Sequence, residues 1–145
     1  MVGMVLSTDM SVHGQLVDEL KSRSEETQKK LSDVNEQLFF CKIIVHSADL
    51  SNPARPFDLS KKWSTLVSEE FNRQVEVEKS MDLPFLPFMI TPDVKTLCKN
   101  EIGFASFAVA PLWKGLGNWF PKLMCHYEQV MSNVDKWKEI MALES

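Results

Sequence analysis

The chain has 145 residues, 44% of them hydrophobic and 25% charged, so it can bury a core and is not a disordered tail. Its formal net charge is −4, with Lys and Arg scattered among acids, which argues against a nucleic-acid-binding surface. No segment approaches the roughly 20 apolar residues of a membrane span, and no signal peptide precedes the first polar residues. We therefore expect one soluble domain, or a large piece of one, with no nucleic-acid partner.

The cysteines bear on the cellular compartment. Cys41, Cys98 and Cys125 are odd in number and widely spaced, and the chain has no CxxC pair. This pattern is typical of buried, reduced thiols rather than of a disulfide framework or a zinc knuckle. We expect a cytoplasmic protein.

The first long periodic segment predicts a helix that ends at Asp49. Both a solvated helix and a loop remain open for Lys21–Lys30 before it. Apolar residues at three- and four-residue steps predict one buried face, formed by Leu31, Val34, Leu38, Cys41, Val45 and Ala48. Ile43, Ile44 and Leu50 are also expected to be buried. Pro53 and Pro56 then frame a short turn.

The rest of the chain also has helical periodicity. Asp58 is the expected N-cap of the next helix, whose predicted buried stripe is Leu59, Trp63, Leu66, Val67, Phe71 and Gln74. Met81–Pro92 predicts an ordered apolar loop. Asn100 is expected to cap a helix that Pro111 kinks, and Pro121 to open a last helix with Met124, Tyr127, Met131, Val134 and Met141 on one face. No alternating strand pattern stands out, so the predicted fold is all-α.

Asp49 is the candidate functional residue that the pattern itself singles out. A carboxylate in the last turn of an apolar helix faces the negative end of the helix dipole and loses hydration on burial. A metal ion, a cationic partner or a set of hydrogen-bond donors could offset these costs. The alternative is an aspartate that caps the following turn, Ser51-Asn52-Pro53.

Several motifs in order carry a family resemblance over nearly the whole chain. They are the runs MVLSTDMSVH from Met4, HSADLSNP from His46, FDLSKKW from Phe57, SEEF from Ser68, IGF from Ile102 and PLW from Pro111. Together they resemble the C-terminal half of the catalytic domain of class I 3′,5′-cyclic nucleotide phosphodiesterases. The resemblance implies an all-helical enzyme that hydrolyses cAMP or cGMP to the 5′-monophosphate in signal transduction.

The resemblance assigns roles residue by residue. It implies a divalent metal pair, zinc-like at one site and magnesium-like at the other, held by two histidines and two aspartates, with Asp49 as the later aspartate. It places Asn52 in the base pocket, Val67 and Phe104 on the two faces of the purine, and Met10 in the pocket wall. A helical Val or Phe is otherwise usually plain core, and an Asn before Pro is a common turn residue.

Glu101 departs from the resemblance. The family normally has a glutamine just before the Ile-Gly-Phe motif, where its amide both donates to and accepts from the purine edge. An ionised carboxylate only accepts. We expect weakened purine binding, with cAMP less penalised than cGMP.

A larger departure concerns the remaining metal ligands and the general acid. His13, His46 and His126 lie in no HDxxH or HNxxH pattern and are interpreted as structural, so no catalytic residue is assigned within the chain. Residues 1–145 are therefore expected to be a partial catalytic domain without the N-terminal half, inactive alone and partnered by that half or by another protein chain. The alternative is a non-catalytic remnant that acts as a helical binding or interaction module.

Overall fold

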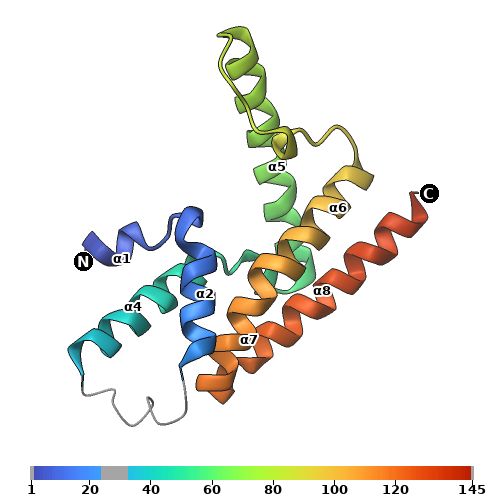
Figure 1. The fold of residues 1–145 in the computed structure, drawn as a ribbon. Helices are drawn as coiled ribbons and strands as arrows, with labels where there is room; N and C mark the ends of the chain where they lie inside the picture. Colours follow the sequence, from blue (N-terminus) through green and yellow to red (C-terminus); the bar gives the residue numbers. More distant parts are fainter. Residues whose placement is uncertain (1, 24–32, 145) are drawn as a thin grey trace.

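The computed structural model describes residues 2–23 and 33–144, and every regular element in them is helical (Figure 1). The elements are α1 (Val2–Leu6), α2 (His13–Ser22), α4 (Val34–Asp49), α5 (Phe57–Ser80), α6 (Val94–Phe104), α7 (Ala110–Trp119) and α8 (Met124–Leu143). A π turn, Ala105–Val109, joins α6 to α7, and 3₁₀ turns span Met10–Val12, Asn52–Ala54, Pro87–Met89 and Pro121–Leu123. The all-α prediction is confirmed. Most of Lys21–Lys30, and Leu31, lie outside the described residues.

Local side-chain caps explain where two of the helices begin. The Asp33 side chain accepts a hydrogen bond from the Asn35 N–H at 2.7 Å at the start of α4, and Asp93 accepts one from the Thr96 N–H at 2.7 Å at the start of α6. The expected cap at Asn100 is wrong, because Asn100 lies inside α6. The expected cap at Asp58 is also wrong, because α5 begins at Phe57 and Asp58 occupies its first turn.

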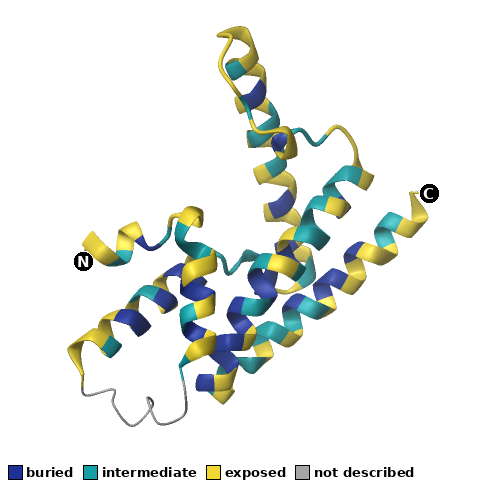
Figure 2. Cartoon of the chain, in the orientation of Figure 1, coloured by how far each residue is buried: buried dark blue, intermediate teal, exposed yellow. Residues whose placement is uncertain are grey.

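The core lies where α2, α4, α7 and α8 meet, and buried positions gather on these helices (Figure 2). Its largest fully buried apolar side chains include Leu20, Ile43, Leu112 and Leu116. Phe40 makes edge-to-face contacts with the rings of Trp119 and Phe120, at centroid distances of 4.9 and 5.6 Å. This aromatic cluster fixes α4 against the end of α7.

The buried face of α4 is not the predicted one. Phe39, Phe40, Ile43, His46 and Ser47 are buried, whereas Val34, Leu38, Cys41, Ile44, Val45 and Ala48 are exposed and Leu50 is half-buried. The helix has apolar residues on more than one side. The described chain covers the side that carries the two phenylalanines.

The predicted stripe of α5 is also on the wrong side. Leu59, Trp63, Leu66, Val67 and Gln74 are exposed and Phe71 is half-buried, while Ser60, Ser64 and Val75 are buried. The far half of α5 and the segment after it project from the body (Figure 1). Asn72 exchanges two hydrogen bonds with the Thr91 backbone, at 2.8 and 2.9 Å, and Phe71 packs edge-to-face on Phe88. The Met81–Pro92 loop is therefore ordered, as predicted.

The last part of the chain follows the predictions more closely. Pro111 lies in the first turn of α7, directly after the π turn, so the α-helical pattern is interrupted just before the proline. Pro121 opens the 3₁₀ turn before α8. On α8, Val134 is buried and Met124, Tyr127, Met131 and Met141 are half-buried.

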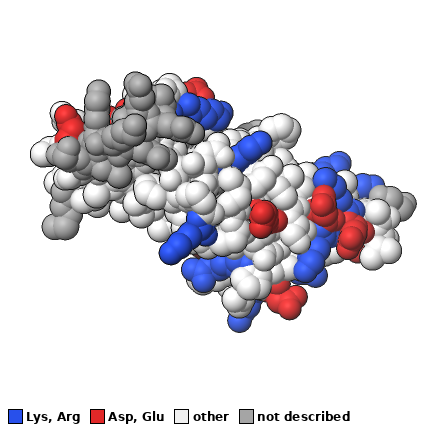
Figure 3. All heavy atoms as spheres, turned by 90° about the horizontal axis from the view of Figure 1, so that it is seen from below, with Lys and Arg blue, Asp and Glu red and all other residues white. Residues whose placement is uncertain are grey.

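The surface shows interspersed Lys, Arg, Asp and Glu on the face seen from below, without a basic patch (Figure 3). Within residues 2–23 and 33–144, no helix is long and apolar enough to cross a membrane. The three thiols are free, but only Cys98 is buried; Cys41 and Cys125 are exposed, which corrects the expectation that all three are buried.

Candidate functional site

Asp49 is the last residue of α4, and its side chain is exposed rather than buried. The last α-helical hydrogen bond of α4 runs from the Leu50 N–H to the His46 carbonyl at 3.1 Å. The Ser51 N–H then bonds to the Ala48 carbonyl at 3.2 Å, and the chain turns into Asn52–Ala54. The desolvation cost expected from the sequence therefore does not arise. Among the described contacts, no hydrogen bond joins the carboxylate to the turn Ser51-Asn52-Pro53, which leaves it open to a ligand.

A histidine pair joins the half-buried His13 at the start of α2 to His46, which lies one turn before Asp49 on α4. His13 Nδ1 and His46 Nε2 are 2.8 Å apart, and His46 is fully buried. Burial lowers the pKa of both imidazoles; the charge of Asp49 partly opposes this for the pKa of His46, and the Ala108 backbone partly opposes it for the pKa of His13. His46 Nδ1 is buried, and no residue in the described part of the chain forms a hydrogen bond with it. Single-sequence reasoning could not find this pair, because 33 residues separate its members.

The turn that carries Asn52 is fixed from α8. The buried side chain of Asn133 donates to the Pro53 carbonyl at 2.9 Å and to the Arg55 carbonyl at 2.7 Å. Asn52 itself is half-buried, and its Oδ1 is buried with no hydrogen-bond donor in the described chain. Such an acceptor is suited to a ligand donor. Asn133 was missed because an asparagine within a helical pattern gives no signal of its partner.

Glu101 lies between α5 and α6, beside the Ser64 hydroxyl. Burial raises the pKa of the Glu101 carboxyl, and the neighbouring Ser64 hydroxyl lowers it in part. Ser64 Oγ also donates to the Ser60 carbonyl at 3.0 Å. No Lys or Arg in the described part of the chain forms an ion pair with Glu101.

Along the helix axes, Val67 and Phe104 lie on opposite sides of the contact between Ser64 and Glu101. Helix α5 runs out from the body and α6 returns toward it, so the two helices have opposite directions (Figure 1). Val67 is one turn beyond Ser64 on α5 and Phe104 is one turn beyond Glu101 on α6, each about 4.5 Å along its helix. Their exposed fractions are 38% and 39%. From helix geometry, Val67 and Phe104 therefore lie on opposite sides of the Ser64–Glu101 contact along the helix axes, and both side chains are accessible.

Met10 begins the 3₁₀ turn before α2 and is 46% exposed. The Asp9 side chain caps this turn by accepting from the Ser11 N–H at 2.8 Å. The turn packs against α2. No described contact brings Met10 together with Val67, Glu101 or Phe104.

The described residues do not assemble a metal centre by themselves. No group of three or more His, Cys, Asp or Glu side chains is placed to hold a metal in residues 2–23 and 33–144. Asp49 offers a single exposed carboxylate. A zinc-like and magnesium-like pair therefore does not fit these residues alone, and no chemical step can be derived through it here.

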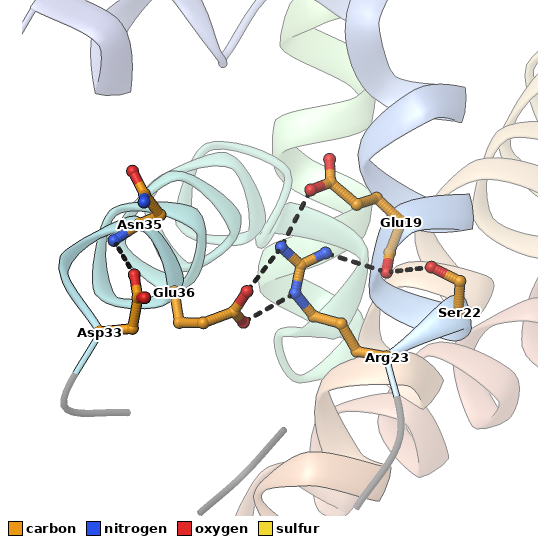
Figure 4. A network of polar contacts seen from close by, with 6 residues as sticks. All are labelled: Glu19, Ser22, Arg23, Asp33, Asn35 and Glu36. Carbon is orange, nitrogen blue, oxygen red and sulfur yellow. Dashed lines mark hydrogen bonds and ion pairs between the residues drawn. The ribbon is translucent and has the colours of Figure 1, made fainter. Parts of the chain in front are cut away.

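Two surface hollows lie away from the candidate residues. One, of about 490 Å³, is enclosed by α1, α2 and α4 and includes the Arg23 network of Figure 4, and the other, of about 440 Å³, is lined by α7 and α8. Neither includes Asp49, Asn52, Val67, Glu101 or Phe104.

Residues 1–130 match the sequence model of the 3′5′-cyclic nucleotide phosphodiesterase family, and the chain belongs to that family. It is 34% identical over 119 residues to a probable 3′,5′-cyclic-AMP phosphodiesterase, pde-4, of Caenorhabditis elegans, covering 78% of this chain and 18% of that protein. It is 28% identical over 149 residues to the human high affinity cGMP-specific 3′,5′-cyclic phosphodiesterase 9A, covering 99% of this chain and 24% of that protein.

The fold is also similar to that of a solved phosphodiesterase domain. The crystal structure of the phosphodiesterase domain of Salpingoeca rosetta rhodopsin phosphodiesterase superposes with a TM-score of 0.87 and 37% identity, covering 97% of this chain and 44% of that chain. The chain therefore spans less than half of the solved catalytic domain and about a fifth of the curated relatives named above.

Proposed function

We propose that this chain forms the C-terminal, purine-binding part of a cyclic nucleotide phosphodiesterase catalytic domain in the cytoplasm. The complete domain hydrolyses a 3′,5′-cyclic nucleotide to the 5′-monophosphate. The observation that carries the proposal is the contact between Ser64 on α5 and Glu101 on α6, which places the accessible side chains Val67 and Phe104 one helical turn away on antiparallel helices. A purine fits between a branched aliphatic side chain and a ring because both of its flat faces are apolar.

Asp49 and Asn52 supply the polar part of the proposed site. Asp49 would contribute one carboxylate to a divalent metal in the complete domain, and such a metal would activate water and stabilise charge on the phosphate. Asn52, with its buried and unpartnered Oδ1, accepts a hydrogen bond from the base. Met10 belongs to the proposed pocket wall. The other metal ligands and the general acid come from a complementary part of the domain.

The proposed substrate is cAMP rather than cGMP. In its charged state, Glu101 accepts a hydrogen bond from the adenine amino group but repels the carbonyl oxygen at the corresponding guanine position, so the proposed preference belongs to this state of the carboxyl group. The relatives named above act on one or the other nucleotide according to their names, so the preference rests on this residue.

The test is loss of hydrolysis in the natural gene product that carries these residues. Asp49→Asn should lower cAMP hydrolysis by about 100-fold or more, because even groups that only orient a metal ligand are worth 10- to 100-fold. Asp135→Asn, an exposed aspartate on α8, is the matched control and should keep full activity. Equal activity in the wild type and the Asp49→Asn variant would refute the metal role.

A second candidate function is a non-catalytic helical interaction module. Large apolar side chains are exposed on α4, α5 and the π turn, and Phe107 is 85% exposed. Together with the lack of a metal cluster in the described residues, this favours a protein partner. If the wild-type gene product hydrolyses neither cAMP nor cGMP with Mg²⁺ and Zn²⁺ present, this function is preferred.

A further inference from the structure

We propose that Glu101 binds the purine as a protonated carboxylic acid, so that binding of a cyclic nucleotide takes up a proton at this side chain. The inference rests on the proposed function, because it concerns the same purine site. It adds a dependence of affinity and selectivity on pH, which the family assignment does not supply.

The first support is the position of the carboxyl group. Glu101 is a half-buried residue of α6 beside Ser64 of α5, and no Lys or Arg of the described chain forms an ion pair with it. Burial without a cation disfavours the charged form and raises the pKa of Glu101. A purine stacked between Val67 and Phe104 would remove more water from the carboxyl and favour the neutral form further.

The second support is that the Ser64 hydroxyl, which favours the charged form of Glu101, offsets the effect of burial only in part. The one proton of this hydroxyl is directed to the Ser60 carbonyl, 3.0 Å from Ser64 Oγ. An ionised Glu101 competes with that carbonyl for the same proton. A neutral Glu101 does not, because its own O–H can donate to Ser64 or, when a purine is bound, to the ring.

The third support is the chemistry of the purine edge. A carboxylic acid has one O–H donor and one C=O acceptor, the same pattern as one face of a glutamine amide. Adenine offers an amino donor beside a ring acceptor, and guanine offers a ring N–H beside a carbonyl. Protonated Glu101 can pair with either edge, whereas the carboxylate only accepts. The preference for cAMP should therefore narrow as the pH falls.

The titratable groups around Glu101 do not supply a fixed counter-charge. Lys61 on α5 and Glu144 after α8 act, together with Glu101, on the pKa of the Cys98 thiol. The π turn Ala105–Val109 carries no titratable side chain. The pKa of Glu101 responds to burial first and to Ser64 second. The protonation state of Glu101 can therefore change when the ligand binds.

The test measures binding by calorimetry between pH 5 and 7.5, in buffers that differ in their heat of ionisation. The protein is the natural gene product with Mg²⁺, and the ligands are the Rp-phosphorothioates of cAMP and cGMP, which resist hydrolysis. For the wild type we expect uptake approaching one proton and affinity that rises toward tenfold per pH unit on acidification. The ratio of the two dissociation constants should move toward one.

Glu101→Gln is the diagnostic variant, because it keeps the size, the donor and the acceptor but cannot titrate. It should bind at least as tightly as the wild type at pH 7.5, with no proton uptake. It also keeps His13 and His46, so any proton uptake from the histidines or the ligand remains in it. Glu70→Gln, an exposed glutamate on α5, is the matched control and should behave as the wild type.

The possible results distinguish failure of this inference from failure of the nucleotide site. Binding without proton uptake, or with the same uptake in Glu101→Gln, overturns this inference and leaves the purine site standing. No binding by the wild type and by Glu101→Gln at any pH overturns the nucleotide site itself, and this inference with it.

Discussion

At the scale of single residues, the histidine pair ties α2 to α4 and makes stability depend on pH. His13 Nδ1 and His46 Nε2 share one hydrogen bond of 2.8 Å, so at most one of the two facing nitrogens needs a proton. Protonating both rings would place two positive charges in contact in a buried site. The contact between the two imidazoles is therefore favourable only while at least one of the rings is neutral.

The sign of the pH effect follows from the lowered pKa of each imidazole. In the unfolded chain these histidines titrate near the ordinary pKa of 6.5, and in the folded chain they titrate lower. As the pH falls below about 6.5, the unfolded state binds protons that the folded state does not, so the free energy of unfolding decreases. Two histidines can change the free energy of unfolding by at most about 2.7 kcal/mol per pH unit.

Urea unfolding between pH 7.5 and 5 measures this slope. His13→Asn removes one imidazole and should flatten the slope, and His126→Asn, outside the pair, is the matched histidine control. If His126→Asn flattens the slope as much as His13→Asn does, the pair is not its source.

The sequence supplied the identities of the candidate residues but not their surroundings. Asp49 was predicted at the end of a helix and lies there, yet it is exposed, because burial depends on what packs around the helix end. Glu101 was interpreted as an ordinary ionised carboxylate. Its burial between α5 and α6 depends on how two helices meet, which the local pattern does not contain.

At the scale of helices, periodicity predicted the elements well and their buried faces poorly. Helix α4 has apolar residues on two sides, and α5 turns small serines, Ser60 and Ser64, toward the chain while Trp63 stays outside. A hydrophobic pattern shows which face is apolar, but it does not show which surface will cover it. Small side chains let helices approach closely, and they carry no apolar signal.

Arg23 joins the end of α2 to the start of α4 (Figure 4). Its guanidinium donates to Glu36 through Nε at 3.0 Å, pairs with the Glu19 carboxylate at 2.9 Å and lies 3.4 Å from the centre of the Phe39 ring. The side chain is 13% exposed. Two carboxylates and an aromatic face thus satisfy one nearly buried cation.

Removing this cation should leave two carboxylates facing each other. We expect Arg23→Ala to lower the free energy of unfolding by about 2 kcal/mol, and Arg23→Lys to recover only part of it, because an ammonium cannot form the planar fork. Arg73→Ala is the matched control: its ion pair with Glu69 is 3.8 Å long and 78% exposed on the arginine side, so the change should be below about 0.5 kcal/mol. Urea unfolding midpoints measure all three variants. Equal losses of unfolding free energy in Arg23→Ala and Arg73→Ala would contradict a stabilising role of the Arg23 contacts.

At the scale of the whole molecule, the described chain leaves much apolar surface uncovered. Four large aromatic side chains of the helical body, Phe39, Phe40, Phe107 and Trp113, differ in their exposure. Only Phe107 is exposed; the other three are 4 to 7% exposed in the core. The exposed apolar residues include Leu38, Ile44 and Val45 on α4, Leu59, Trp63 and Leu66 on α5, and Phe107.

We expect the 145-residue chain, produced alone, to self-associate or to bind a hydrophobic dye strongly, because exposed apolar side chains of this kind favour association. The double variant Trp63→Gln with Phe107→Gln should elute closer to the 16.6 kDa monomer on gel filtration, without loss of cooperative unfolding, since neither side chain is in the core. Leu143→Gln, 87% exposed at the end of α8, is the matched control and should not restore the monomer. A sharp monomer peak, weak dye binding and cooperative unfolding of the wild-type chain would mean that these faces need no partner, and that the described helices form a self-sufficient domain.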